Sequence, residues 1–556
     1  MKIKLAVLTF LCCFILNAQT TKQPNILWIV CEDISPTLSM YGDHNAKTPN
    51  LDKLAQKSIV YTNAFATTGV CAPSRSAIIT GMLPSSIGTM HMRTAKDVMS
   101  WGKRSYKEVA TRGEENPEPV LDLKGNTIRE YSAVVPDGIK CFTEYLRASG
   151  YYCTNNQKTD YQFAAPISAW DENDPKAHWR NRPEGKPFFS VFNLGDTHES
   201  RIWLNKDLPL TVDPTKVFLP PYFPDNAVVR NDVARHYSNI EIMDKNAGII
   251  IDQLIKDGLY DDTIIFFYSD HGGPLPRQKR EIYESGLKAP LFIKLPNSQT
   301  FSKNDRLISF TDLGPTVLSL ANVKPPKGIE GRPFLGKYEC KSREFVFGTS
   351  DRFDEFSDRI RSVRTEKYLY IKNYHPELPK YKDVGYRKSM PMMMNMLTLK
   401  EANQLDQYQL SWFQSKVTEE LYDIINDPYS MTNLAENPAY QKVLNQLRKQ
   451  EIKKFEKDYD FGSLPEADMI AKMWPNNTQP ITAKPSYSIK NGVLTASCAT
   501  KSASISYKMS KSKDEKFDVS SKWTLYTQPI PIPKGHYVYI IANRIGFQDS
   551  AIVMAK

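Results

Sequence analysis

Three continuous apolar runs, each followed at once by polar or acidic residues, constrain the fold of this chain most. They are Asn25–Val30, Pro187–Leu194 and Thr263–Ser269. An unbroken apolar run of this kind is typical of a strand that is buried on both faces of a parallel sheet. Helical patterns lie between the runs, at residues 50–57, 137–149 and 234–256. The alternation predicts an α/β domain with a large, mostly parallel sheet flanked by helices and a ligand site at the carboxyl edge of its strands.

The chain is too long for one simple core, so several domains are expected over its 556 residues. We expect the catalytic α/β domain at residues 22–340 and a smaller α+β subdomain at residues 341–473. Residues 474–485 are rich in proline and have no apolar periodicity, which is typical of a linker. The short alternating segments that follow predict an accessory β-sandwich over residues 486–556.

Residues 1–18 have the pattern of a secretory signal peptide. Lys2 and Lys4 precede an apolar run from Leu5 to Leu16, and cleavage is expected after Ala18. The run is too short to serve as a transmembrane anchor, so we expect an exported protein, either periplasmic or secreted. The formal charge of +10 suits a protein that meets polyanions, and the sequence contains no nucleic-acid-binding motif.

The cysteines lack the spacing of a disulfide scaffold or a zinc cluster. Outside the leader they are Cys31, Cys71, Cys141, Cys153, Cys340 and Cys498. Stability is therefore expected to come mainly from packing. Cys141 and Cys153 flank a predicted helix, and a disulfide between them is one option in an oxidising compartment.

The segment Cys71-Ala72-Pro73-Ser74-Arg75 fixes a cysteine, a proline and an arginine at set offsets. Taken alone, such a segment also fits a small buried cysteine beside a turn. It resembles the C-x-P-S-R maturation signal of type I sulfatases, which belong to the alkaline phosphatase superfamily. The resemblance extends to residues 48–55, 311–316 and 420–434. It implies an alkaline-phosphatase-like fold, and oxidation of Cys71 to formylglycine by a formylglycine-generating maturation enzyme.

Acidic residues at two strand ends indicate a metal site. Glu32 and Asp33 follow the first apolar run, and Asp270 and His271 follow the third. Carboxylates that converge at strand ends are what a hard divalent cation requires, whereas a single acid pair also fits a helix cap or a solvated loop. The resemblance implies that these four residues hold the metal, with calcium expected. Glu32 stands where the family has Asp and His271 offers nitrogen, so magnesium, manganese and zinc stay open.

The resemblance also implies catalytic roles. Arg75 would hold the ionised hydrate of formylglycine, Lys158 and Lys279 would bind sulfate, and His198 would protonate the leaving alcohol as general acid. Arg280 is an alternative to Lys279 and also fits plain surface charge. Asp160 stands where the family has a histidine, and either Asp160 or a metal-linked water is expected to deprotonate the second hydroxyl.

Two further residues follow the motif helix and are expected near the pocket mouth. They are His91 and Arg93, which we interpret as substrate-binding residues, with ordinary loop packing as the alternative. Residues 101–129 and Met390–Met396 are expected to shape the pocket.

These observations predict an exported sulfatase that hydrolyses sulfate esters of a sulfated oligosaccharide or polysaccharide. One alternative is a phosphomonoesterase or phosphodiesterase of the same superfamily, which generally uses two metals and a Ser or Thr nucleophile. The other is a catalytically inactive glycan-binding protein in which Cys71 stays unmodified. The glycan, the sulfate position, the choice of O- or N-sulfate, and endo or exo action depend on pocket shape.

Overall fold

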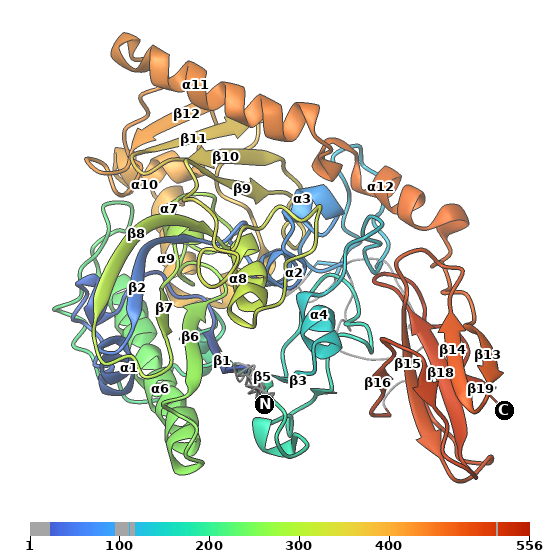
Figure 1. Ribbon diagram of the computed structural model, residues 1–556. Coiled ribbons are helices and arrows are strands. Elements are labelled where there is room, and N and C mark those ends of the chain that lie inside the picture. The colour runs from blue at the N-terminus through green and yellow to red at the C-terminus, as the bar shows by residue number, and fades with distance from the viewer. Residues whose placement is uncertain (1–22, 95–109, 112–116, 519–520, 556) are drawn as a thin grey trace, which may run out of the picture.

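The computed structural model describes residues 23–94, 110–111, 117–518 and 521–555 (Figure 1). The predicted signal peptide and much of the predicted pocket loop at residues 101–129 lie outside the described residues. Among the described residues, no helix combines the length and the apolar character needed to cross a membrane.

The core of the molecule is an eight-stranded sheet with the order β4-β3-β5-β1-β6-β7-β2-β8. Its strands are β1 (Asn25–Cys31), β2 (Ile59–Phe65), β3 (Tyr152–Asn156), β4 (Glu172–Asn173), β5 (Phe188–Leu194), β6 (Thr263–Ser269), β7 (Leu291–Lys294) and β8 (Ser302–Ser309). Only β7 runs antiparallel to its neighbours. The three apolar runs form β1, β5 and β6, which pair in parallel at the centre. The predicted mixed, mostly parallel sheet is confirmed.

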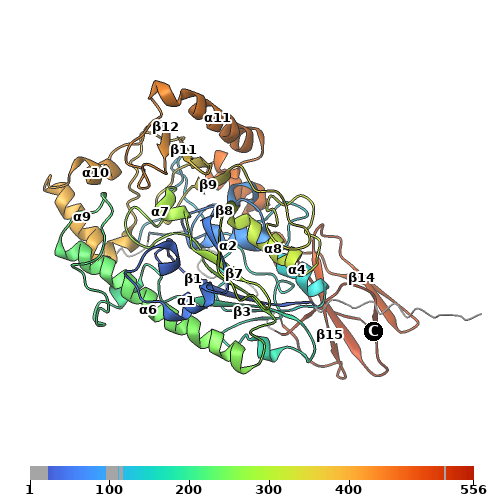
Figure 2. The ribbon, with the colours of Figure 1, turned by 60° about the vertical axis from the view of Figure 1, so that its left-hand side comes forward.

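Helices cover both faces of this sheet, as Figure 2 shows. One face packs against α2 (Cys71–Thr80), α4 (Phe142–Ala148) and α8 (Leu313–Leu320). The other packs against α1 (Pro49–Ala55), α6 (Ala227–Lys256) and α9 (Pro391–Glu401). The methionines at residues 390–396 that were expected to shape the pocket are mostly buried in this second core.

Two predicted helix starts differ from the structure, and local capping explains both. The helix expected from residue 234 begins at Ala227, because the Asn226 side chain accepts hydrogen bonds from the backbone N–H groups of residues 228 and 229. The helix expected from residue 137 begins at Phe142, after Cys141, where Glu144 completes a capping box.

A second, four-stranded antiparallel sheet has the order β12-β11-β10-β9. Its strands are β9 (Val346–Ser350), β10 (Ile360–Arg364), β11 (Tyr368–Asn373) and β12 (Glu419–Asp423), and helix α11 (Gln441–Ile452) lies across it. A further helix, α12 (Glu466–Met473), packs with residues that follow the motif helix. This part therefore adds an α+β layer to the carboxyl-terminal side of the main sheet (Figure 1).

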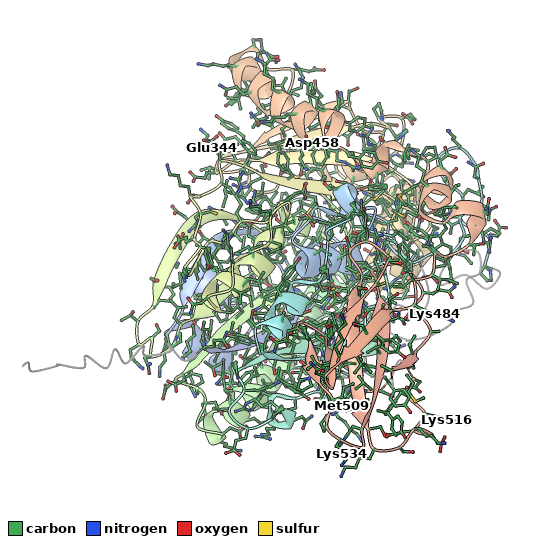
Figure 3. All side chains as sticks on the ribbon, turned by 45° about the vertical axis from the view of Figure 1, so that its right-hand side comes forward. Glu344, Asp458, Lys484, Met509, Lys516 and Lys534 are labelled. Atoms are coloured by element: carbon green, nitrogen blue, oxygen red, sulfur yellow. The ribbon has the colours of Figure 1, made fainter. Side chains whose placement is uncertain are left out.

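Two facing antiparallel sheets form the C-terminal part of the chain. Their strands are β13 (Ser486–Lys490), β14 (Val493–Ser497), β15 (Ser504–Ser510), β16 (Thr524–Leu525), β17 (Ile530–Pro531), β18 (Tyr537–Asn543) and β19 (Val553–Ala555). Leu494, Val538 and Ile540 are fully buried between the sheets. The exposed Lys484, Lys516 and Lys534 lie on the outside of this sandwich (Figure 3).

The sandwich is docked on α4 through buried polar contacts. Arg147 donates from Nη2 to the Trp523 carbonyl at 2.8 Å and to Asp171 at 2.9 Å. Glu144 accepts from the Ser504 hydroxyl at 2.5 Å. The expected linker also contacts the catalytic part, since the indole N–H of buried Trp474 donates to the Ser132 carbonyl. The sandwich is therefore anchored to the catalytic part by these hydrogen bonds.

The disulfide considered for Cys141 and Cys153 is wrong for this structure, in which both thiols are free and buried. Cys141 caps α4, and the Cys153 thiol lies 3.9 Å from the Thr143 carbonyl.

Truncation of the chain after residue 485 tests the docking. Removal of the sandwich leaves Arg147 and Glu144 without their C-terminal partners, so we expect the melting temperature of the catalytic part to fall by at least about 5 °C. Differential scanning calorimetry of the full and truncated chains measures this. A full-length Lys534→Ser variant is the control, and an unchanged melting temperature after truncation would show that the sandwich is only tethered.

Candidate active site

The parallel register of the central strands brings the predicted acids together. Because β1 pairs with both β5 and β6, the three strands end at the same edge of the sheet. Glu32 and Asp33 follow β1, His198 follows β5, and Asp270 follows β6. The Asp270 N–H donates to the Cys31 carbonyl, which extends the pairing of the two strands into the site.

Cys71 is the first residue of α2 and is fully buried at the centre of the site. Its Sγ atom lies 3.5 Å from His271 Nε2, 3.7 Å from Lys279 Nζ and 3.8 Å from Asp33 Oδ1. Burial alone would raise the pKa of this thiol, but Lys158 and Lys279 outweigh burial and lower the pKa to about 7. The site thus stabilises negative charge at the position of this side chain.

A glycine lets the cysteine turn approach the lysine turn. A Cβ atom on Gly69 would lie 2.5 Å from the Glu281 carbonyl oxygen, closer than real contacts allow. The Gly69 carbonyl accepts from the Arg280 N–H at 2.7 Å. Because only glycine leaves room here, the segment that carries Cys71 packs directly on the turn that carries Lys279.

Asp33, Asp270 and His271 form a buried cluster of potential metal ligands together with Cys71. His271 Nε2 lies 3.0 Å from Asp33 Oδ1 and 3.9 Å from Asp270 Oδ1. The opposite ring nitrogen, Nδ1, donates to the Gly272 carbonyl at 3.0 Å. In a neutral imidazole this bond leaves the Nε2 lone pair facing the two carboxylates, an arrangement that a cation stabilises.

These donors fit a divalent cation. Without one, burial alone would lower the pKa of His271, but Asp270 and Asp33 outweigh burial and raise it to about 10. Two carboxylates and an imidazole nitrogen in a dry pocket are the ligand types that divalent metals take.

Glu32 belongs to a different group from the other predicted ligands. Its Oε1 lies 2.6 Å from Lys158 Nζ and 3.4 Å from Arg75 Nη2. Its carboxylate also lies in a second potential ligand group, with Cys71 and His198. The structure therefore places Glu32 beside the cations of the site, while Asp33 and Asp270 lie beside His271.

Three cationic side chains that the sequence predicted for the site surround Cys71. They are Arg75, Lys158 and Lys279. Arg75 donates from Nε to Asp270 at 3.1 Å and from Nη1 to the Asn193 side chain at 2.7 Å. Lys279 donates to Asp33 Oδ2 at 2.5 Å. Burial would lower the pKa of Lys158 and of Lys279, but the neighbouring anionic groups outweigh it, so both pKa values are raised and both ammonium groups stay charged.

His198 lies on the half-buried side of the site, next to Ser200. Its Nδ1 atom accepts the Ser200 backbone N–H at 3.3 Å. In the neutral ring the proton therefore lies on Nε2.

Asp160 and Arg93 lie side by side near Lys158. Arg93 Nη1 is 3.6 Å from Asp160 Oδ1, and Lys158 Nζ is 3.8 Å from Asp160 Oδ2. Burial would raise the pKa of Asp160, but Arg93 and Lys158 outweigh burial and lower it. A carboxylate with a lowered pKa is a weaker base than a free one.

His91 lies in a buried contact with α12 and with the segment that follows β9. Its Nδ1 accepts the Arg352 N–H at 3.2 Å and lies 3.8 Å from Glu466. Burial lowers the pKa of His91 to about 4, against the opposing effect of Glu466. The imidazole thus joins the catalytic part to the second subdomain.

Sequence reasoning missed a buried ion-pair network behind Lys279. Arg280, which fitted surface charge, is 2 % exposed and forms two hydrogen bonds with Glu199 at 2.8 and 2.9 Å. It also donates to Asp354 at 3.0 Å. The Glu199 N–H donates to Asp33 Oδ2 at 2.7 Å. The sequence offered one signal for this network, since Glu199 directly follows His198, the predicted general acid.

Comparison with known proteins assigns the family. The sequence model of the Sulfatase family matches residues 24–323, and that of the N-sulphoglucosamine sulphohydrolase C-terminal region matches residues 277–405. The chain belongs to the sulfatase family, whose members hydrolyse sulfate esters. An ulvan-active sulfatase of Formosa agariphila is 42% identical over 571 residues, which cover 96% of this chain and 91% of the relative. The predicted family and enzyme class are confirmed.

Solved structures share the fold at low identity. A sulfatase from Bacteroides thetaiotaomicron has a TM-score of 0.54 at 18% identity, covering 80% of this chain and 94% of its own. A phosphonate monoester hydrolase from Silicibacter pomeroyi also has a TM-score of 0.54, at 15% identity, covering 79% of this chain and 96% of its own. The fold therefore accepts more than one ester chemistry, and the side chains of the site must distinguish them.

The buried His91 predicts an acid-sensitive stability. Its folded-state pKa of about 4 lies below the value of about 6.5 for an unfolded chain, so stability is complete above about pH 6.5 and falls as the pH drops towards 4. Over this pH range, the free energy of unfolding should fall by up to about 3 kcal/mol less in His91→Gln than in the wild type, because the variant has no imidazole to protonate. Urea unfolding at several pH values measures the difference.

The matched control is His536→Gln, which changes an imidazole at the edge of the sandwich. This variant should retain the wild-type pH dependence. Equal pH slopes for His91→Gln and the wild type would contradict the assignment.

Proposed function

We propose that this protein is an exported sulfatase that removes sulfate esters from a sulfated polysaccharide with a formylglycine made from Cys71. The observation that carries the proposal is the position of Cys71, buried between Lys279 and the Asp33–His271 pair. The relative that matches nearly the whole chain is named for activity on ulvan. A sulfated polysaccharide of this kind is the substrate class that we propose.

The thiol of Cys71 stands where the oxygens of the matured side chain would lie. A formylglycine hydrate supplies two hydroxyls on one carbon, one to attack sulfur and one to expel the sulfate afterwards. The groups that lower the pKa of the thiol, Lys158 and Lys279, would also stabilise an ionised hydroxyl at this position. We propose that a formylglycine-generating enzyme acts on Cys71 before the chain folds, because the folded chain buries it completely.

Asp33, Asp270 and His271 are the residues that we propose to hold a divalent metal, with Glu32 at its edge. Calcium fits the carboxylates best, and the His271 nitrogen keeps magnesium, manganese and zinc open. The bound ion supplies a positive charge that favours an ionised hydroxyl and attracts sulfate oxygens.

The charge balance of the described site favours a sulfate monoester. Its carboxylates are Glu32, Asp33, Asp160, Glu199, Asp270 and Asp354, and its permanent cations are Arg75, Arg93, Lys158, Lys279 and Arg280. With His271 neutral and a divalent ion bound, these groups carry one positive charge in excess before the nucleophile ionises. A sulfate ester carries one negative charge and would neutralise the loaded site.

Arg75, Lys158 and Lys279 are proposed to hold the three sulfuryl oxygens. They approach Cys71 from α2, from the loop after β3 and from the turn after β6, so they surround the position of the sulfur. Preorganised cations in a dry site stabilise charge more than cations in water, so this electrostatic contribution is expected to exceed that of proton transfer.

His198 is proposed to protonate the leaving alcohol. The Ser200 N–H occupies Nδ1, so the Nε2 proton is available on the other side of the ring. For deprotonation of the second hydroxyl, the lowered pKa of Asp160 favours a water molecule over Asp160.

Export rests on the signal-peptide pattern of residues 1–18, which lie outside the described residues. A periplasmic or secreted enzyme would reach a polysaccharide that does not enter the cytoplasm.

Two rival functions are less well supported. Two-metal phosphoesterases need a second set of ligands, and both potential ligand groups among the described residues share Cys71. An inactive glycan-binding protein would not need three cations directed at one buried cysteine.

Intact mass of the peptide that contains Cys71 tests the proposal. In protein made together with a formylglycine-generating enzyme, we expect the mass of an aldehyde in place of the thiol. We also expect Cys71→Ala to lower sulfatase activity at least about a thousandfold. A Cys340→Ala variant, which changes an exposed thiol, is the control. An unmodified thiol in fully active protein would refute the proposed nucleophile.

His198→Asn tests the general acid. The loss in kcat should be about 100-fold or more for a sugar sulfate, whose alcohol needs a proton to leave, and much smaller for 4-nitrophenyl sulfate, whose phenolate leaves without one. Steady-state kinetics with both substrates give the comparison. Equal losses on the two substrates would remove His198 from this role.

A further inference from the structure

Two polar atoms near the mouth of the site lack hydrogen-bond partners although they are buried. They are Arg93 Nε and Asp160 Oδ2. Arg93 lies 3.6 Å from Asp160 and 4.0 Å from Asp354, which are ion-pair distances but too long for hydrogen bonds. A buried polar atom without a partner is destabilising, so this arrangement is unfavourable unless something else bonds to it.

The backbone of the same three residues is strained. Arg93, Asp160 and Asp354 have φ angles of 65°, 54° and 53°, in the left-handed region that favours glycine. Such a conformation is unfavourable for a residue with a side chain, and strained residues that persist in one cluster indicate a functional constraint. The strain and the unsatisfied atoms thus coincide in one place.

This place adjoins the reacting centre, and part of the Arg93 side chain reaches the surface there. The Arg93 side chain is 26% exposed. Lys158 lies 3.8 Å from Asp160 and 2.6 Å from Glu32, which shares a ligand group with Cys71 and His198. A group bound between Arg93 and Asp160 would therefore sit beside the leaving alcohol.

We propose that Arg93, Asp160 and Asp354 form a subsite for two adjacent hydroxyl groups on the sugar ring that carries the sulfate. This inference rests on the proposed function. One hydroxyl donates to Asp160 Oδ2 and accepts from Arg93, and the other donates towards Asp354. A hydroxyl both donates and accepts, so it satisfies the acid and the arginine together.

The charge of the subsite excludes a second anionic group. Two carboxylates face Arg93, while the other nearby cations are already held, Lys158 by Glu32 and Arg280 by Glu199 and Asp354. A second sulfate or a uronate carboxylate beside the first would meet net negative charge. The preferred ring therefore bears one sulfate and neutral hydroxyls next to it.

The test compares a hydroxyl-bearing substrate with analogues that lack the hydroxyl. The substrate is the methyl glycoside monosulfate, among those of rhamnose, galactose and glucose, that the wild type hydrolyses fastest. The analogues are its mono-deoxy derivatives at the positions next to the sulfate. In the wild type, we expect kcat/KM to fall at least about tenfold when the bonded hydroxyl is removed.

In Asp160→Asn and in Arg93→Lys, the ratio of kcat/KM between the parent and the deoxy substrate should fall about tenfold or more. The reason is that each substitution lowers kcat/KM less for the deoxy compounds than for the parent. Circular dichroism and melting temperature establish folding, and Glu184→Gln, at an exposed position, is the control. Unchanged discrimination in both folded variants would overturn the subsite. In particular, equal losses of kcat/KM on the parent and deoxy substrates would overturn the subsite, because they would make Asp160 part of the chemical step.

Failure of the proposed function has a different signature. In that case, matured wild-type protein would release no sulfate from any of these glycosides or from 4-nitrophenyl sulfate. An active wild type that shows no preference for the hydroxyl, by contrast, overturns the subsite alone.

Discussion

The mutual attraction of buried charges at one edge of the central sheet is the interaction on which the rest of this structure depends. Asp33 and Asp270 are fully buried, and neither would stay ionised in such a position without partners. Lys279 and Arg75 supply those partners directly. Breaking one pair leaves a buried charge uncompensated, so each member holds the others in place.

The fold serves this charge cluster at several levels. The parallel register of β1, β5 and β6 delivers three polar segments to one edge. Gly69 allows the cysteine turn to touch the lysine turn. The second subdomain contributes Asp354, which binds Arg280. The subdomain is therefore part of the site, and the sandwich is docked on α4.

Much of the site was predictable from sequence because its residues directly follow strands. Glu32, Asp33, His198, Asp270 and His271 each come within a few positions of an apolar run, and parallel strands end together. The central strands were predictable because each is a continuous apolar run. Helix starts were less so, because the capping side chain of Asn226 decides where α6 begins.

The buried network around Arg280 was not predictable, because its partners are distant in the chain. Arg280 lies 81 residues from Glu199 and 74 from Asp354, and an arginine in a charged segment looks like surface charge. The docking of the sandwich was hidden likewise, since Arg147 and Trp523 are separated by 376 residues. Only the tertiary structure shows that these charges are buried.

Anomalous diffraction from crystals of the matured protein is the measurement that tests the account most directly. The account predicts one cation peak between Asp33, Asp270 and His271 Nε2, next to an oxygenated side chain at position 71. A map with no cation among these residues, and with an intact thiol at position 71 in protein that is active on sulfate esters, would contradict it.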